Sequence, residues 1–241
     1  MAIIHTIKKL LALSCLAFLF AGCAKDVPVV SKVITRLECY QGGNLQYGIG
    51  YKYDSKGNLT DMVDLSNIYD HSRTFYYSPE SITILGGRGA CIINIDKTGI
   101  PEKIVSESGI IMCSYGSDGR LSRFDVNSGE TNYTLSTQTK DGNFTSLPDF
   151  AGNTLKYTYT QYENNYSIDL NSVPQIENIF TMFNTMKVHG MYSRNLIKSI
   201  VSGDTSYYFT YNFDSSGRVT DMIVVSTASE NSLTEHYKFT Y

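Results

Sequence analysis

The chain has 241 residues, with 20 basic and 23 acidic side chains and a formal net charge of −3. The basic residues form no stripe along the sequence, which argues against nucleic acid as a partner. Tyrosine and glycine each occur 19 times, and tryptophan is absent. Tyrosine favours strands and glycine favours tight turns, so the composition predicts a β protein.

Residues 1–22 predict an export signal. Lys8 and Lys9 precede an apolar run from Leu10 to Phe20, and small residues lead up to Cys23. This order is typical of a secretory signal peptide, and the run is too short to cross a bilayer as a mature helix. The remaining length suits one sizeable β domain or two smaller ones.

The segment "LFAGC" that ends at Cys23 resembles the lipobox of bacterial lipoproteins. In that family the cysteine becomes the first mature residue and carries acyl chains. Ala21 and Gly22 match the small positions, whereas Phe20 departs from the usual Leu or Val. The resemblance implies that the membrane is a partner, reached through a lipid anchor on Cys23. The alternative is an ordinary cleaved signal with an unrelated cysteine.

The residues after Cys23 bear on location. Ala24 rather than Asp follows the cysteine, which resembles lipoproteins sorted to the outer membrane. Lys25 and Asp26 resemble a short form of the charged tag on surface lipoproteins of gut anaerobes. We therefore expect a lipid-anchored outer-membrane protein exposed on the cell surface, with residues 23–31 as a lipidated tether.

Three cysteines follow the tether, at Cys39, Cys91 and Cys113. Three thiols cannot all pair, and no spacing indicates which two would form a disulfide. Each lies in an apolar, strand-like run, which favours small buried hydrophobic residues. No CxxC motif and no metal-ligand spacing occurs.

Two nearly identical stretches, "YKYDSKGNLTDM" at 51–62 and "YNFDSSGRVTDM" at 211–222, indicate how the chain folds. In both, an aspartate precedes a glycine by three residues. A type I turn favours aspartate at its first position, and a glycine with positive φ then leads into the return strand. We therefore predict antiparallel hairpins at Asp54–Gly57 and Asp214–Gly217, and no catalytic motif.

Looser copies of the same unit recur about every 20 residues, a spacing that fits two strands and two short turns. We expect their turns at Pro79, Asp96–Gly99, Asp118–Gly119, Asp141–Gly142 and Asn164–Asn165. These units resemble the tyrosine–aspartate (YD) repeats of RHS-like proteins. The resemblance is good in two units and degraded in the others.

About 190 residues at the C-terminal end resemble a family of uncharacterised lipoprotein domains of gut bacteria, described as porin-like in fold. The segments that carry the resemblance are "NNYSIDLNSVP" at 164–174, "YSRNLIKSI" at 192–200, the hairpin at 211–222 and the closing "HYKFTY". The resemblance implies a fold and no activity, since that family has no established function.

One segment departs from the β pattern. Apolar residues recur at three- and four-residue spacing from Ile176 to Met186, between Pro174 and Gly190. This pattern predicts an amphipathic helix at about 174–189. We expect it to pack on the sheet or close a barrel end. A lid or a partner-binding helix is the alternative.

Aromatic residues alternate along two later strands, from Tyr207 to Phe213 and from Tyr237 to Tyr241. Alternate residues of a strand share a face, so each run places its aromatic rings together. Such a face is expected to form a layer of the core. In the alternative it is a platform for sugar rings, with Tyr207, Tyr211 and Tyr237 as candidate ligand-binding residues. Glycan platforms usually also contain tryptophan.

No catalytic or cofactor motif is present. GxSxG, HExxH, P-loop and dinucleotide-loop patterns are absent, and His71, His189 and His236 are isolated. We expect no enzyme activity, no cofactor and no metal. A hydrolase whose two carboxylates are brought together by folding is the alternative.

The aromatic C-terminal residue raises the alternative of a membrane-spanning barrel. Such barrels need strands of about nine to eleven residues with one apolar face. The strands here look shorter, and "PEKIVSES" and "DGRLSRF" carry charge on both faces. A soluble carrier of small molecules is a further alternative, and it requires a closed barrel with an apolar cavity.

We therefore predict an all-β domain over residues 32–241. Its fold is an antiparallel meander of successive hairpins that forms a strongly curved sheet or barrel, with one helix at 174–189. The expected function is non-enzymatic, either binding of a glycan or surface protein or a structural role.

Overall fold

The computed structural model describes residues 33–66, 72–86, 89–129, 131–148, 154–171, 190–228 and 231–241. Residues Lys32–Tyr241 form one compact unit. The predicted signal and tether at 1–31 and the predicted helix at 174–189 lie outside the described residues. Among the described residues, no helix has the length and hydropathy needed to cross a membrane.

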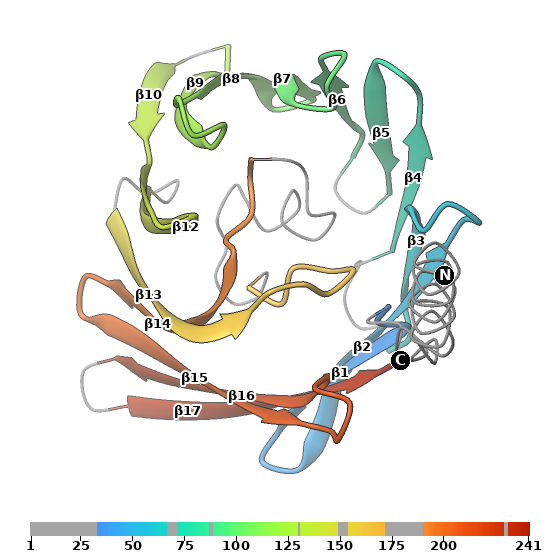
Figure 1. Ribbon diagram of the computed structural model, residues 1–241, viewed down its shortest axis with the longest axis vertical. Coiled ribbons are helices and arrows are strands. Elements are labelled where there is room, and N and C mark those ends of the chain that lie inside the picture. The colour runs from blue at the N-terminus through green and yellow to red at the C-terminus, as the bar shows by residue number, and fades with distance from the viewer. Residues whose placement is uncertain are drawn as a thin grey trace, which may run out of the picture. The chain divides into compact units, whose positions relative to one another are not determined.

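The described part of the unit contains seventeen β-strands (Figure 1). The first nine are β1 (Arg36–Gln41), β2 (Asn44–Tyr53), β3 (Leu59–Asp64), β4 (Arg73–Tyr77), β5 (Ser81–Leu85), β6 (Cys91–Ile95), β7 (Pro101–Ser106), β8 (Gly109–Tyr115) and β9 (Leu121–Asn127). The others are β10 (Asn132–Ser136), β11 (Gln138–Lys140), β12 (Asn143–Pro148), β13 (Thr154–Glu163), β14 (Asn195–Ser202), β15 (Thr205–Phe213), β16 (Val219–Ala228) and β17 (Asn231–Thr240).

The strands form one antiparallel, nearly closed, barrel-like sheet. Strands that follow one another in sequence pair with one another, and β1 pairs with both β2 and the last strand, β17. At β10 and β11 the two parts of the sheet are connected by the chain itself, because these two strands follow each other in sequence. β10 pairs with β9, whereas β11 pairs with β12. The predicted meander of hairpins is therefore confirmed.

The two predicted hairpins have the expected turn. The Gly57 amide donates to the Asp54 carbonyl at 3.0 Å, and the Asp54 carboxylate accepts hydrogen bonds from the Lys56 and Asn58 amides at 2.8 Å. Gly57 has a φ of 84°, which glycine adopts without the strain that a Cβ would add. The β2–β3 register shifts between Lys52 and Tyr53, as a bulge beside the turn requires.

The second copy repeats this geometry at Asp214. The Gly217 amide donates to the Asp214 carbonyl at 3.0 Å, and the Asp214 carboxylate accepts from the Ser216 and Arg218 amides at 2.9 Å. Asp96 binds the amides of Thr98 and Ile100 in the same way. The β2–β3, β6–β7 and β15–β16 connections therefore contain the same turn.

The turn predicted at Asn164–Asn165 is wrong. β13 ends at Glu163, and the next strand, β14, begins only at Asn195. The described residues 164–171 run on without strand pairing, and the side chain of Asn164 donates to the carboxylate of Asp169. These polar side chains bind each other and the backbone, so the chain leaves the hairpin pattern here.

The inner face of the sheet is mostly apolar. Side chains that alternate along the strands point inward and form one buried cluster, in which Phe75, Ile93, Phe124, Ile200 and Tyr237 are members from different strands. The aromatic run from Tyr207 to Phe213 and the run from Tyr237 to Tyr241 both pack against this cluster. The expected aromatic core layer is thus present.

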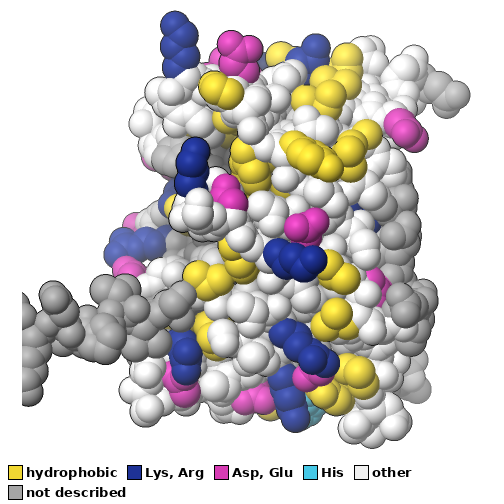
Figure 2. Space-filling model, turned by 90° about the vertical axis from the view of Figure 1, so that its right-hand side faces the viewer, with side chains coloured by type: hydrophobic (Ala, Val, Ile, Leu, Met, Phe, Trp, Pro, Cys, Tyr) yellow, Lys and Arg dark blue, Asp and Glu magenta, His cyan; other side chains and the backbone are white. Residues whose placement is uncertain are grey.

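The outer face is mixed. Lys52 pairs with Asp61 across β2 and β3, and Lys238 lies between Asp221 and Glu38 across β16, β17 and β1. Apolar side chains also occur there, including the exposed Tyr76, Ile92 and Ile110 at aligned positions of β4, β6 and β8. Figure 2 shows such mixing on one face, where charged side chains lie among hydrophobic ones.

The expectation of strands shorter than those of a membrane-spanning barrel holds for twelve of the seventeen described strands, which have three to eight residues, and fails for the other five. β2, β13, β16 and β17 each have ten residues, and β15 has nine. Strand length alone therefore does not decide between this sheet and a membrane-spanning barrel, and the charge on the outer face is a second property that bears on the question.

We expect Asp214→Ala to lower the melting temperature, because two turn amides and the Arg218 side chain lose their acceptor. Asp204→Ala is the control, since Asp204 is an exposed residue in the β14–β15 turn. Differential scanning calorimetry measures both. Equal melting temperatures for the two variants would contradict the role of the aspartate.

Acid should destabilise the protein through these turns. Hydrogen bonds lower the pKa of four turn aspartates below the ordinary value of 3.8. The largest contribution comes from the Asn58 side chain at Asp54 and from the Thr98 side chain at Asp96. It comes from the Arg120 amide at Asp118 and from the Arg218 amide at Asp214. A lowered folded-state pKa adds stability above about pH 3.8 that is lost as the pH falls through the folded value. Melting curves between pH 2 and 5 should show this loss, and replacing the four aspartates with asparagine should flatten it.

Candidate functional site

The end of the sheet that carries the aspartate turns is held by tyrosine hydroxyls. Each donates to a backbone carbonyl at or near the start of the strand that precedes its own, at 2.6–2.9 Å. The donor and acceptor pairs are Tyr53 and Ile34, Tyr77 and Leu59, Tyr115 and Pro101, Tyr159 and Phe144, Tyr211 and Ile197, and Tyr241 and Val219. We call these six contacts the tyrosine clamps.

The clamp hydroxyls stay protonated at neutral pH. Burial raises the pKa of Tyr53 and Tyr77 to about 12. Burial also raises the pKa of Tyr115, Tyr159, Tyr211 and Tyr241 well above the ordinary tyrosine value. They are therefore hydrogen-bond donors, and none has the low pKa of a catalytic tyrosine.

The β13–β14 connection binds the same end of the sheet through backbone amides. Its described residues are 164–171 and 190–194. Five amides at or near strand starts donate to it, at 2.9–3.1 Å. The donors and acceptors are Ile34 and Ser167, Leu121 and the Gly190 carbonyl, Phe144 and Ser193, Ile197 and Asn171, and Val219 and Tyr166.

The connection also contributes to the core. Tyr166, Ile168, Leu170 and Met191 are all buried. Gly190 has a φ of 75°, and a Cβ there would lie 2.6 Å from the Gly119 carbonyl oxygen and 2.9 Å from the Tyr115 ring. Only glycine fits this approach. The connection is therefore built into this end of the sheet.

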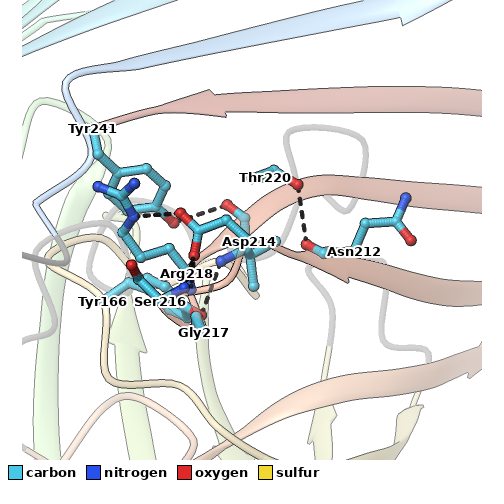
Figure 3. Close-up of polar contacts among 9 residues, drawn as sticks. Tyr166, Asn212, Asp214, Ser216, Gly217, Arg218, Thr220 and Tyr241 are labelled. Carbon is cyan, nitrogen blue, oxygen red and sulfur yellow. Dashed lines mark hydrogen bonds and ion pairs between the residues drawn. The ribbon is translucent and has the colours of Figure 1, made fainter. Parts of the chain in front are cut away.

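Figure 3 shows how the second repeat meets the connection and the C-terminal residue. The Arg218 guanidinium lies 2.7 Å from the Asp214 carboxylate and 4.8 Å from the centre of the Tyr241 ring. The Tyr166 hydroxyl donates to the Gly217 carbonyl at 3.2 Å, and its ring lies 6.3 Å from that of Tyr241. The side chains of Tyr166, Asp214 and Arg218 thus each have a structural partner.

The three candidate ligand residues do not form an exposed platform. Tyr237 is fully buried, with 0% of its surface exposed. Tyr211 uses its hydroxyl in a clamp, and Tyr207 is a partly buried residue that packs against the core. All three lie on the inner face of the sheet, where their rings contribute to packing.

A polar cluster lies on the inner face where β17, β1 and β2 meet. Glu235 is only 5% exposed, and the Tyr237 hydroxyl donates to its carboxylate at 2.7 Å. Cys39 lies opposite Tyr237 on one side and Tyr47 on the other. Burial raises the pKa of the Cys39 thiol to about 11.

The three cysteines of the domain are free thiols, so no disulfide forms among them. Cys39 and Cys91 are buried, as expected for small hydrophobic residues, and Cys113 is partly buried. Burial raises the pKa of Cys91 to about 11 and of Cys113 to about 12. Thiols with raised pKa values are poor nucleophiles.

Within the described ranges, no three His, Cys, Asp or Glu side chains come together as metal ligands would. The buried carboxylates there have local partners. Asp64 accepts from Ser66, Asp169 accepts from the Asn171 amide, and Glu235 accepts from Tyr237.

Two features were missed from the sequence. The segments at 164–174 and 192–200 carry the family resemblance, but nothing in them indicated the role of the β13–β14 connection, because its hydrogen bonds go to strands that are distant in sequence. Glu235 had a usable signal, since strict alternation in "SLTEHYKFT" places it on the face of Tyr237 and Phe239.

No protein-family model and no curated protein matches this chain. Among solved structures, a porin-like protein from Bacteroides uniformis is similar, with a TM-score of 0.62 and 15% identity over 87% of this chain and 98% of that one. This likeness concerns the fold. The TcdB2-TccC3-TEV crystal structure also matches, at 13% identity over 82% of this chain and 10% of that one, but its TM-score of 0.27 supports no shared fold.

We expect Tyr211→Phe to destabilise the protein by about 1–2 kcal/mol, because it removes the donor to the carbonyl of Ile197, a buried residue. Tyr208→Phe is the matched control on the same strand, since Tyr208 is 53% exposed. Urea unfolding measures both. A cost for Tyr211→Phe no larger than that for the control would contradict the clamp.

Proposed function

We propose that this chain is a non-enzymatic outer-membrane lipoprotein whose β domain is held at the cell surface by acyl chains on Cys23. There it would bind a glycan or another surface protein, or serve structurally. The observation that carries the proposal is the distribution of charge over the sheet, which is mostly apolar inside and has lysines at positions opposite acidic residues outside.

The outer charges argue that water, rather than lipid, covers this face. A membrane-spanning barrel presents an apolar band outward, and one Lys or Arg at its midplane costs about 2–4 kcal/mol. Here Lys238 lies among Asp221 and Glu38, and Lys52 faces Asp61. A domain of this kind needs a separate attachment to a membrane, and the lipobox-like segment at Cys23 would supply one.

The polar groups of the domain argue for a non-enzymatic role. The carboxylates of the repeated turns bind their own turn amides, and the clamp hydroxyls bind strand carbonyls. A porin-like fold neighbour is compatible with such a role and with an outer-membrane location. Because the outer face is charged, we favour a lipid-anchored domain over a membrane-spanning pore as the form of outer-membrane protein.

Palmitate labelling with membrane fractionation tests the anchor. We expect the wild-type protein to incorporate a palmitate analogue and to sediment with outer membranes. Cys23→Ser should abolish the label and leave the protein extractable by alkaline carbonate. Cys15→Ser is the control, because Cys15 lies within the expected signal and should not carry the lipid.

The outcomes separate the alternatives. A Cys23→Ser protein that resists carbonate extraction would support a membrane-spanning barrel and contradict the proposal. A wild-type protein that carries no label and is found in soluble fractions would support a secreted carrier. Protease treatment of intact cells reports on surface exposure in the same strains.

A further inference from the structure

The buried carboxyl of Glu235 lies at the seam that closes the sheet. β1 pairs with the last strand, β17, and with β2, so it joins the two ends of the domain. Glu235 lies opposite Gln41 of β1 and Val224 of β16. Two residue pairs further along, on the same face, Tyr237 lies opposite Cys39, which lies opposite Tyr47.

The groups that face the Glu235 carboxyl carry no positive charge that would balance its negative charge when it ionises. β17 contributes the Tyr237 hydroxyl, β1 contributes the Gln41 amide and the Cys39 thiol, β2 contributes the Tyr47 hydroxyl, and β16 contributes the aliphatic Val224. None of these five is a cation. An ionised carboxylate that is 5% exposed loses most of its hydration and receives one hydrogen bond from Tyr237 in return.

Burial therefore raises the pKa of Glu235 above its ordinary value of 4.5, and the hydrogen bond from Tyr237 acts in the opposite direction. The thiol and the two hydroxyls beside it have raised pKa values of their own, so they stay neutral through the range in which a carboxyl titrates. Glu235 is thus the group of this cluster that changes charge.

We propose that Glu235 makes the closure of the sheet sensitive to pH. The protonated carboxyl packs in the seam and keeps β1 paired with β17 and β2, and its ionisation loosens these pairs. Because the folded-state value is raised, the stabilisation is complete below about pH 4.5 and is lost as the pH rises through the folded-state value. One proton is released on loosening, so the opening equilibrium changes by up to tenfold per pH unit within that window.

Hydrogen exchange on the full chain tests the proposal. Amide protection factors, corrected for the intrinsic pH dependence of exchange, are measured between pH 4 and pH 9. We expect protection in β1, β17 and β2 to fall across the window, while β5–β8 change less. Glu235→Gln should remove the fall and leave the seam better protected at high pH than in wild type.

Glu102→Gln is the matched control, because Glu102 is an exposed glutamate on β7. It should leave the pH profile of the seam as in wild type. The proposal is overturned if wild type shows no fall above pH 4.5, if Glu235→Gln titrates as wild type does, or if protection falls equally in every strand.

A second variant, Tyr237→Phe, distinguishes an effect of Glu235 ionisation from an effect of side-chain packing. This test remains available if Glu235→Gln does not fold. It keeps the ring but removes the hydroxyl that lowers the pKa of Glu235. We expect the fall in seam protection to move to higher pH. A merely structural role for Tyr237 predicts the same loss at every pH, and that result would overturn the pairing on which the proposal rests.

Discussion

The repeated hairpins of the sheet depend on the hydrogen bonds that a carboxylate accepts from the amides of its own turn. At Asp54, Asp96 and Asp214 the side chain binds the amides two and four residues ahead. These bonds reverse the chain within a few residues and set the register of the strands on either side. The sheet is a series of local reversals, three of which use this turn, so almost every strand pairs with its neighbour in sequence.

Local reversals do not by themselves close a sheet. Two sets of hydrogen bonds between residues distant in sequence hold the strands together at one end. The tyrosine clamps tie each donor strand to the strand before it, and the β13–β14 connection accepts amides from β9, β12, β14 and β16. The last closure, between β1 and β17, is made by strands near the two ends of the domain. That closure is where the interior contains the Glu235 carboxyl.

The sequence was informative where structure is local. The aspartate-to-glycine spacing predicted the hairpins, and alternation along "YYFTYNF" predicted which aromatic rings share the inner face. It was uninformative where the partner is distant. The turn expected at Asn164–Asn165 failed because Asn164 binds Asp169 and Arg194 rather than a return strand. Strands as long as β16 and β17 were not expected from the sequence.

The repeated residues are unavailable for chemistry because the fold already uses them. Aspartates that bind turn amides have lowered pKa values, and tyrosines that bind carbonyls have raised ones, so both are held away from the range of a general acid or base. If the repeated residues are used in this way, any activity must depend on other groups. The remaining candidates are the outer face, with its aligned apolar and charged side chains, and the segment around Cys23. Functional variation between proteins with this hairpin template is therefore expected at outward-facing strand positions, where a substitution leaves the turns and clamps intact.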